Sequence, residues 1–502
     1  MKPTKLLVSI VVLVAIVFAA APELTSAQGG TGIFPIPLDH PAAPFIETQA
    51  YAQSVGATAE WRKMEGVAVD EVNNYLYLAM SEIGKGMADQ EGDIRLPENR
   101  CGIVYQMALD ENYNVSNMKP LIVGVPVEDE TNPCDVNAIA NPDGLYVDPK
   151  GRVWIGEDTD NHENNVLWMF DPTDGSLKRF ATVPVGAEVT GLKILEDGTI
   201  FFNVQHPSPR ALYPYNRGVI GVVVGVKATD DWAEVPVPEG DAKLTVQIPE
   251  GATYVILGRV GEPIPGAPNG AVFGEVIRPD GSTQLICNDP DGNMPLMITA
   301  DEGYLYTNFE CRPGAVSKLY IKRDAEGMWH AIEGETVDFS SVNGSWNNCN
   351  ASVTPWNTGL TSEEYPAESQ DSWAPSSSGG AMTDYLGRPA NAYDYGYIVE
   401  LIPAEGVGTK VIKHYAMGRF SMEQAQVMPD GKTAYYGDDG TNRVLYKFVA
   451  EEAGDLGYGT LYAAKVTQLE DQSFNIEWIE LGVGDDLAIW QAIRELDAAF
   501  AG

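Results

Sequence analysis

Basic residues are scarce in this chain. Its 502 residues include 32 Lys or Arg against 71 Asp or Glu, which gives a formal net charge of −39 at pH 7. Such a chain repels the phosphate backbone of nucleic acids and the anionic surface of membranes, so we expect neither as a partner. Its natural small partners are cations, and an anionic substrate would need a metal or a local basic patch.

Long apolar runs are also missing, with one exception at the N-terminus. There a basic start is followed by an apolar run over 6–21 and by small residues before Gln28. This order is typical of a secretory signal peptide, whereas the run is short for the alternative of an uncleaved membrane anchor. We predict a signal peptide over 1–27, cleaved near Ala27, and a secreted or periplasmic protein that consists of a single domain over 28–502.

Cysteine is rare, and its count is odd. The five residues are Cys101, Cys134, Cys287, Cys311 and Cys349. In an oxidising compartment four of them can form two disulfides, most simply Cys101–Cys134 and Cys287–Cys311, although four cysteines allow three pairings. In every case one thiol is left over, and a metal is one group that could occupy it.

A repeated β-hairpin pattern takes the place of helical periodicity over most of the chain. A small or polar residue leads into an alternating apolar strand, a turn follows, and a second β-rich strand ends in polar residues. The six copies lie at 66–78, 144–155, 191–202, 296–306, 351–361 and 425–436. Further strand material follows each copy, so the pattern predicts an all-β fold, a six-bladed β-propeller. We expect long top-face insertions, the longest over about 207–290, and a helix over 485–500 outside the ring.

Polar residues at the ends of these hairpins predict a crowded site. With a turn midway, both ends of a hairpin return to the same face, so six radial hairpins would aim these side chains at one mouth of the central channel. The residues before the first strands are Glu65, Asp143, Glu188, Cys349 and Glu423, with Asn293 the weaker candidate in the fourth copy. The residues that end the second strands are Glu82, Asp158, Gln205, Glu310, Glu363, Glu364, Asp438 and Asp439.

Clustered carboxylates cannot all ionise in a confined site unless positive charge is supplied. Oxygen ligands suit Ca²⁺, Mg²⁺ or Mn²⁺, whereas a thiolate favours a transition metal such as Fe. We therefore predict a mixed metal cluster. The alternative is that the carboxylates are ordinary turn residues and that Cys349 is an inert buried thiol. Recurrence at one register position in five copies argues against it.

The chain has neither a serine nucleophile elbow nor a glycine-rich phosphate loop, so a metal would have to carry the chemistry. His206, which follows Gln205 at a hairpin end, is the best placed histidine for acid–base catalysis. Lys63 and Arg62 precede Glu65 and could hold an anionic oxygen, or be solvated loop cations. The remaining candidates are His162, His414, Arg419 and Arg443.

The stretch over 347–364 reads NNCNASVTPWNTGLTSEE. It resembles the cysteine motif of the PhoX-type alkaline phosphatases. Similar likenesses to that family lie at 63–65, 141–144, 188–191, 205–207, 418–423 and 436–448. In the family the cysteine motif comes before the segments that resemble 65–206, whereas here it comes after them. We therefore predict a circular permutation, which a ring of repeats tolerates.

The resemblance implies a phosphomonoesterase that depends on Ca²⁺ and Fe³⁺. It implies that Cys349 and Glu423 bind iron and that further carboxylates bind calcium or iron. Those carboxylates are Glu65, Asp143, Glu188, Glu364 and Asp438. Three positions depart from the family: Lys63 stands for an Arg, Met422 for a His and Ser362 for a Cys. Because lysine lacks the bidentate fork of arginine, the first departure predicts weaker phosphate binding or a different substrate.

These observations together predict a secreted, monomeric phosphatase that hydrolyses small phosphate monoesters at a Ca/Fe cluster. Lys63, Arg62 and His206 would assist the metals. Two alternatives remain open. One is a calcium-dependent lactonase or arylesterase, which would have no use for Cys349. The other is a non-catalytic binding propeller whose metals are structural.

Overall fold

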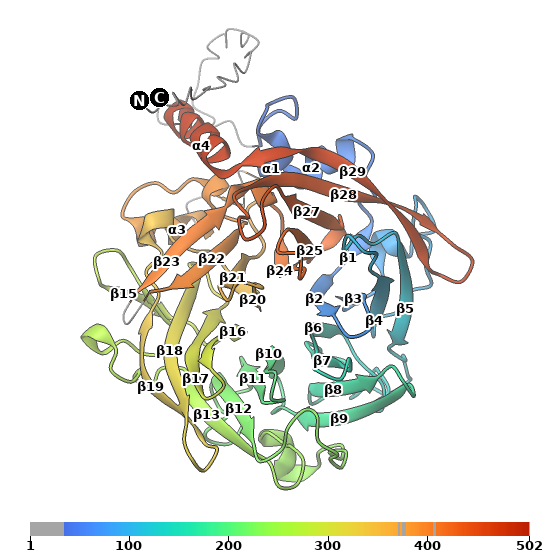
Figure 1. The fold of residues 1–502 in the computed structure, drawn as a ribbon, viewed down its shortest axis with the longest axis vertical. Coiled ribbons are helices and arrows are strands. Elements are labelled where there is room, and N and C mark those ends of the chain that lie inside the picture. Colours follow the sequence, from blue (N-terminus) through green and yellow to red (C-terminus); the bar gives the residue numbers. More distant parts are fainter. Residues whose placement is uncertain (1–34, 370–371, 374–377, 405–407, 501–502) are drawn as a thin grey trace, which may run out of the picture.

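The computed structural model describes residues 35–369, 372–373, 378–404 and 408–500. The signal peptide predicted over 1–27 lies outside the described residues. The strands form six blades arranged radially around one axis, which is the six-bladed β-propeller predicted from the repeats (Figure 1). Among the described residues, no helix is long and apolar enough to cross a membrane.

Each blade contains four antiparallel strands that run in chain order from the axis outward. Blade I comprises β2 (Met64–Asp70), β3 (Tyr75–Met80), β4 (Ile103–Ala108) and β5 (Asn117–Val123). Blade II comprises β6 (Pro142–Val147), β7 (Val153–Glu157), β8 (Val166–Asp171) and β9 (Ser176–Thr182). Blade III comprises β10 (Glu188–Ile194), β11 (Ile200–Gln205), β12 (Val219–Val224) and β13 (Thr253–Arg259).

The other three blades repeat this order. Blade IV comprises β16 (Pro290–Thr299), β17 (Glu302–Phe309), β18 (Ala315–Arg323) and β19 (Trp329–Thr336). Blade V comprises β20 (Asn348–Val353), β21 (Gly359–Glu363), β22 (Ile398–Pro403) and β23 (Thr409–His414). Blade VI comprises β24 (Met422–Val427), β25 (Thr433–Asp438), β27 (Tyr446–Ala450) and β28 (Tyr458–Gln468). The six hairpins found in the sequence are the two innermost strands of each blade.

Further helices and short strands lie outside the four-stranded blades. The helices are α1 (Ala43–Ile46), α2 (Thr48–Ser54), α3 (Ser378–Leu386) and α4 (Asp486–Phe500), the last being the C-terminal helix expected outside the ring. The short strands are β1 (Trp61–Arg62), β26 (Thr441–Arg443), β14 (Glu275–Ile277) and β15 (Thr283–Ile286). The segment 207–290 supplies β12 and β13 of blade III as well as the β14–β15 hairpin, so much of it belongs to a blade.

The ring is closed by the last hairpin of the chain. β28 pairs with β29 (Phe474–Asp485), and β29 reaches β5 of blade I, where Phe474 lies opposite Met118 and Asn475 opposite Asn117. Blades VI and I thereby share one nine-stranded sheet. Phe474 is fully buried, with its ring 5.2 Å from that of Trp61. Hydrogen bonds and apolar burial therefore join the two ends of the ring.

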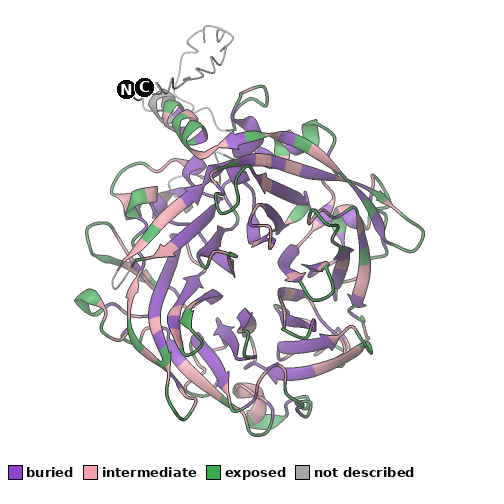
Figure 2. Ribbon diagram, in the orientation of Figure 1, coloured by how far each residue is buried: buried purple, intermediate pink, exposed green. Residues whose placement is uncertain are grey.

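Apolar side chains on the inner strands pack between neighbouring blades. Buried residues follow these strands, whereas exposed residues concentrate in the loops and along the outer edges (Figure 2). One buried cluster, for example, joins Tyr77 and Ala79 of blade I to Leu145, Ile155 and Trp168 of blade II. Alternation along each strand thus buries apolar groups between the sheets.

Glycines allow the inner strands of adjacent blades to approach closely. A Cβ atom on Gly66 of blade I would lie 2.5 Å from the carbonyl oxygen of Asp143 in blade II. A Cβ on Gly292 of blade IV would lie 2.5 Å from the amide nitrogen of Ala351 in blade V. Backbone atoms cannot give way as a flexible side chain can, so these positions need glycine.

We predict that Gly292→Ala destabilises the protein by about 3 kcal/mol, because the added methyl group overlaps backbone of blade V. Gly144→Ala is the matched control. It holds the equivalent place in blade II, but its Cβ would meet only the Asn350 side chain, at 3.9 Å. Thermal and denaturant unfolding should show a large loss for Gly292→Ala and little change for Gly144→Ala. Equal stability of the two variants would contradict this account of the blade contact.

Candidate metal centre

A β-bulge recurs where the inner strands reach one mouth of the propeller. In blade I, Met64 pairs with Met80 and Val67 with Leu78, so Glu65 and Gly66 together face one residue. Such a bulge turns a side chain away from the regular alternation. The same two-against-one arrangement is present in the other blades. In five blades its first residue carries a ligand-type side chain, and these residues are Glu65, Asp143, Asp291, Cys349 and Glu423.

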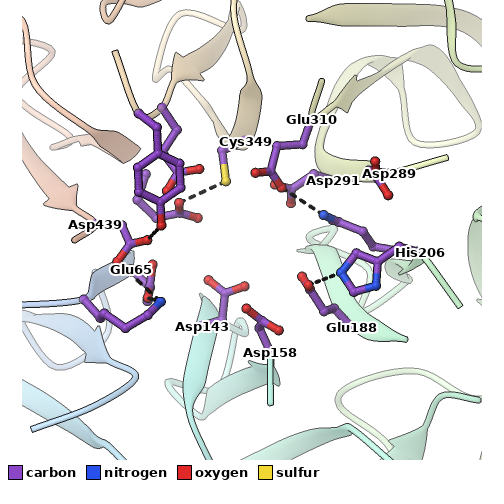
Figure 3. Close-up of a pocket in the computed structure, with 15 residues that line it drawn as sticks. Glu65, Asp143, Asp158, Glu188, His206, Asp289, Asp291, Glu310, Cys349 and Asp439 are labelled. Atoms are coloured by element: carbon purple, nitrogen blue, oxygen red, sulfur yellow. Dashed lines mark hydrogen bonds and ion pairs between the residues drawn. The ribbon is translucent and has the colours of Figure 1, made fainter. Parts of the chain in front are cut away.

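These side chains line a cavity of about 370 Å³ that opens to solvent. Figure 3 shows them around a common space, with Cys349, Glu310 and Asp291 facing Asp143 and Asp158 from the opposite side. Besides the five bulge residues, the lining comprises Lys63, Asp158, Glu188, Gln205, His206, Asp289, Glu310, Glu364, Tyr365 and Asp439. Within the described part of the chain, ten carboxylates and a thiol thus face one lysine and one histidine.

Within the described lining of the cavity, three groups of ligand atoms are close enough to share an ion. Within each group the ligand atoms lie within 4.8 Å of one another. The groups are Asp291, Glu310 and Cys349; Cys349, Glu364 and Glu423; and Glu65, Asp143 and Glu423. Because Cys349 and Glu423 each belong to two groups, the three form one continuous cluster, and their Sγ and Oε2 atoms are 3.0 Å apart.

Burial and mutual repulsion raise the pKa values of these acids. Burial is the larger cause for Glu65, whose pKa is raised to about 7, and Asp439 adds to it. Burial, followed by repulsion from Glu310, raises the pKa of Asp291 to about 8. The pKa of the Cys349 thiol is also raised, first by burial and then by nearby carboxylates. The acids whose pKa values are raised in the same way are Asp143, Glu188, Glu310, Glu364 and Glu423.

The donor set fits metal ions. Asp143 Oδ1 is buried and makes no hydrogen bond among the described residues. Buried carboxylate oxygens without a partner are costly, and a cation would satisfy them. Carboxylates suit a hard cation such as Ca²⁺, and the thiol of Cys349 adds a soft ligand that suits iron. The residues therefore match the mixed cluster expected from the sequence.

One basic side chain reaches into the cavity. The Nζ atom of Lys63 lies 3.0 Å from Glu65 Oε1 and 3.4 Å from Asp439 Oδ1, and its side chain is 31% exposed. Tyr365 donates its hydroxyl to the other oxygen of Asp439. The attraction of Glu65 is the largest cause that raises the pKa of Lys63, so the ammonium group keeps its charge.

His206 lies at the edge of the cavity beside Glu188. Its Nε2 atom contacts Glu188 Oε1, and its Nδ1 atom is 3.2 Å from the carbonyl oxygen of Gly186. Both ring nitrogens therefore lie next to oxygen atoms. The side chain is 42% exposed, so this ring is open to solvent and to a ligand.

Other candidates from the sequence lie elsewhere. Arg62 does not line the cavity, because it pairs with Glu82 at 2.6 Å. Asp438 is turned away and faces Arg443, while Asp439 lines the cavity in its stead. Asn293 donates to the carbonyl of Gly191 as part of the packing between blades. The remaining residues form buried ion pairs or backbone contacts away from the cavity, and they are Glu363, His162, His414 and Arg419.

Three lining residues were not among the sequence candidates for the site, and they are Asp289, Asp291 and Tyr365. Asp291 lies two residues before Asn293, and only the bulge of blade IV shows that its register matches that of Glu65. Tyr365 follows Glu364 and adopts a left-handed backbone conformation (φ 46°), which a sequence pattern does not reveal. Asp158, Glu310 and Asp439 were recognised as strand-end residues, and the structure brings them into the lining.

The raised pKa values predict how metal-free protein responds to pH. Glu65 and Asp291 have pKa values of about 7 and about 8 in the folded chain, against ordinary values near 4 in the unfolded chain. The folded state therefore holds more protons between these limits, so its stability falls as the pH rises from about 4 to 8. We expect the thermal unfolding midpoint of chelator-treated protein to decrease as the pH is raised from about 5 to 8.5.

Added Ca²⁺ should remove that fall, because a bound cation favours the ionised carboxylates. Asp291→Asn is an informative comparison. It should stabilise the metal-free protein at about pH 8, since one buried acid no longer ionises, and it should weaken the effect of Ca²⁺. A midpoint that rises with pH in the metal-free protein would contradict the repulsion described above.

Solved structures match the chain only at low sequence identity. A gluconolactonase from Xanthomonas campestris is 14% identical, with 68% of this chain and 96% of that chain covered and a TM-score of 0.28. The calcium-binding protein regucalcin from Agrobacterium tumefaciens is 11% identical, with 72% and 93% covered and a TM-score of 0.27. The Dos1 propeller is 8% identical, with 84% and 96% covered and a TM-score of 0.33. These overlaps are too loose to bear on function.

Sequence families give a firmer result. No curated protein sequence matches the chain. The family model of alkaline phosphatase PhoX matches residues 38–208 and 324–499, more than two thirds of the chain. These segments carry Glu65, Asp143, Glu188, Cys349 and Glu423, the same residues that converge in the cavity. The chain therefore belongs to the alkaline phosphatase PhoX family.

Proposed function

We propose that the protein is an exported, metal-dependent phosphatase that hydrolyses small phosphate monoesters in the cavity. Family membership supports a hydrolase that acts on phosphate esters. The observation that carries the proposal is the donor set of the cavity, in which ten carboxylates and one thiol surround a space that a single lysine enters. An acidic cavity can hold a phosphate ester only if bound cations reverse its field.

Cys349 and Glu423, with Glu364 beside them, would hold Fe³⁺, since the only thiol of the cavity lies there. The oxygen-rich side of the cavity would hold Ca²⁺. Its ligands would be Glu65, Asp143, Asp158, Glu188, Asp291 and Glu310. Bound cations would polarise the phosphoryl group and neutralise the charge that develops on its oxygens.

Lys63 would position the substrate. Two carboxylates hold its ammonium group in place, and a third N–H remains to donate to a phosphoryl oxygen. Lysine presents a point charge, so this contact attracts the phosphate without fixing its rotation. The left-handed backbone at Lys63 (φ 49°) directs its side chain toward Glu65.

His206 would act as the proton donor to the leaving group. Its contacts with Glu188 and Gly186 hold the ring at the edge of the cavity. From there it could release a proton to the ester oxygen as the bond to phosphorus breaks. Glu188 would hold the ring in orientation.

Two features support export. The N-terminal sequence has the pattern of a signal peptide. The structure also contains the disulfides Cys101–Cys134 and Cys287–Cys311, which is the simplest of the pairings considered above. Disulfides persist mainly in oxidising compartments outside the cytoplasm. Cys349 remains a free, buried thiol.

Removal of metal should abolish hydrolysis. We expect the purified protein to hydrolyse p-nitrophenyl phosphate at alkaline pH, and complete chelation to lower kcat by at least about 100-fold. Addition of Ca²⁺ to a calcium-depleted, iron-containing sample should restore activity. A simple lactone assayed in parallel should show no turnover. Full activity after proven loss of all metal would refute the mechanism, and lactone turnover alone would favour the lactonase alternative.

The iron assignment depends on Cys349. We expect Cys349→Ser to lose most of its iron, measured by elemental analysis, and to lose phosphatase activity, because a serine hydroxyl is a poor ligand in place of a thiolate. Ser362→Ala is the matched control. Ser362 faces the bulge of Cys349 on the adjacent strand, and its buried hydroxyl makes no hydrogen bond among the described residues. Unchanged iron content in Cys349→Ser would overturn the assignment.

A further inference from the structure

Arg312 lies at the rim of the cavity in a loop that no family motif covers. The loop joins β17 to β18, and Arg312 follows the cavity residue Glu310 by two positions. Its guanidinium carbon is 5.5 Å from the ring centroid of Trp346 and 5.8 Å from that of Tyr365. Tyr365 itself lines the cavity, so the guanidinium lies just outside the lining, on the side of blades IV and V. The segment 209–323 falls between the two stretches that match the family.

Arg312 differs from the other cations near this mouth in its lack of an anionic partner. Lys63 is held by Glu65, and Arg443 pairs with Glu368 at 2.6 Å. For Arg312, by contrast, the described part of the chain provides neither a hydrogen bond nor an ion pair to the side chain, and the Nε atom is buried without a partner. Such a gap is unexpected in a chain with 71 acidic residues.

The two aromatic rings explain how the guanidinium stays in place without a carboxylate. Trp346 is 2% exposed and forms a rigid wall, stacked on Tyr395 at 5.6 Å. Cation–π contact attracts the guanidinium and covers part of it, while the N–H groups at its edge remain available. A stacked guanidinium of this kind is preorganised for bidentate binding of a carboxylate or a phosphate.

We propose that Arg312 binds a second anionic group on the substrate and thereby selects its leaving group. The inference rests on the proposed phosphatase function. Lys63 and the cluster ligands lie inside the cavity, where the reacting phosphate would bind. Arg312 lies at the rim, so it faces the part of the ester that projects outward. The preferred substrates are phosphate monoesters whose leaving group carries a carboxylate or a further phosphate.

Two esters that differ by one carboxylate test the proposal. Wild-type protein should show a higher kcat/KM for 4-carboxyphenyl phosphate than for phenyl phosphate. In Arg312→Gln this preference should fall about tenfold, the usual scale of one charge-assisted hydrogen bond, while kcat/KM for phenyl phosphate stays within about twofold. Arg312→Lys should retain part of the preference, since it keeps the charge and loses the fork. Arg278→Gln, in the outlying β14–β15 hairpin, should keep all of it.

A binding measurement separates this proposal from the phosphatase function. Calorimetry on the metal-loaded protein should show that (4-carboxybenzyl)phosphonate binds more tightly than benzylphosphonate, and that Arg312→Gln removes the difference. Thermal unfolding of each variant confirms that it is folded. If neither ester is hydrolysed but the difference in binding depends on Arg312, the phosphatase function fails and the anion site stands. Equal binding of the two phosphonates by wild type, or an unchanged difference in Arg312→Gln, overturns the proposal.

Discussion

At the mouth of the propeller, two residues of each inner strand face a single residue of the next strand, and this bulge directs a side chain toward the axis. Because the blades are arranged radially, five such side chains converge on one space. Blade III is the exception, since its bulge falls at Gly191 and Leu192, and Glu188 reaches the cavity from the first residue of β10. The cluster therefore depends on a repeated backbone irregularity as much as on the identity of its residues.

The convergence of these carboxylates is electrostatically unfavourable, and the rest of the fold must compensate for it. Like charges meet at close range in a buried site, and the pKa values of Glu65 and Asp291 rise well above ordinary values as a result. The close packing of inner strands at glycines prevents the carboxylates from moving apart. The closing hairpin, with Phe474 buried against blade I, keeps the ring from opening. Carboxylates that repel one another in the metal-free protein would bind cations as ligands. The geometry that destabilises the metal-free protein therefore favours metal binding.

The sequence predicted the features that recur along the chain, and it missed the site residues whose positions depend on the local register of a strand. The six hairpins and the positions of Cys349 and Glu423 follow from a repeated spacing, which is a property of the chain alone. Asp291 was missed in favour of Asn293 because a bulge adds one residue to a strand, and its place cannot be counted from an apolar pattern. Asp438 and Asp439 alternate across a strand end, so an error of one residue exchanges the cavity side for the side of Arg443. The circular permutation remains a prediction.

Blade IV supplies cluster residues from outside the two family-matched segments. Its strands β16, β17 and β18 lie between the two family-matched segments, yet Asp291 and Glu310 share a ligand group with Cys349. The disulfide Cys287–Cys311 links the chain just before β16 to the chain just after β17. Asp291 and Glu310 lie close to these two cysteines in the sequence. Once that link and the bulge fix the ligands, the loop after β17 is free to carry other side chains. Arg312 stands in that loop, so a change there could alter the leaving group without moving the metals.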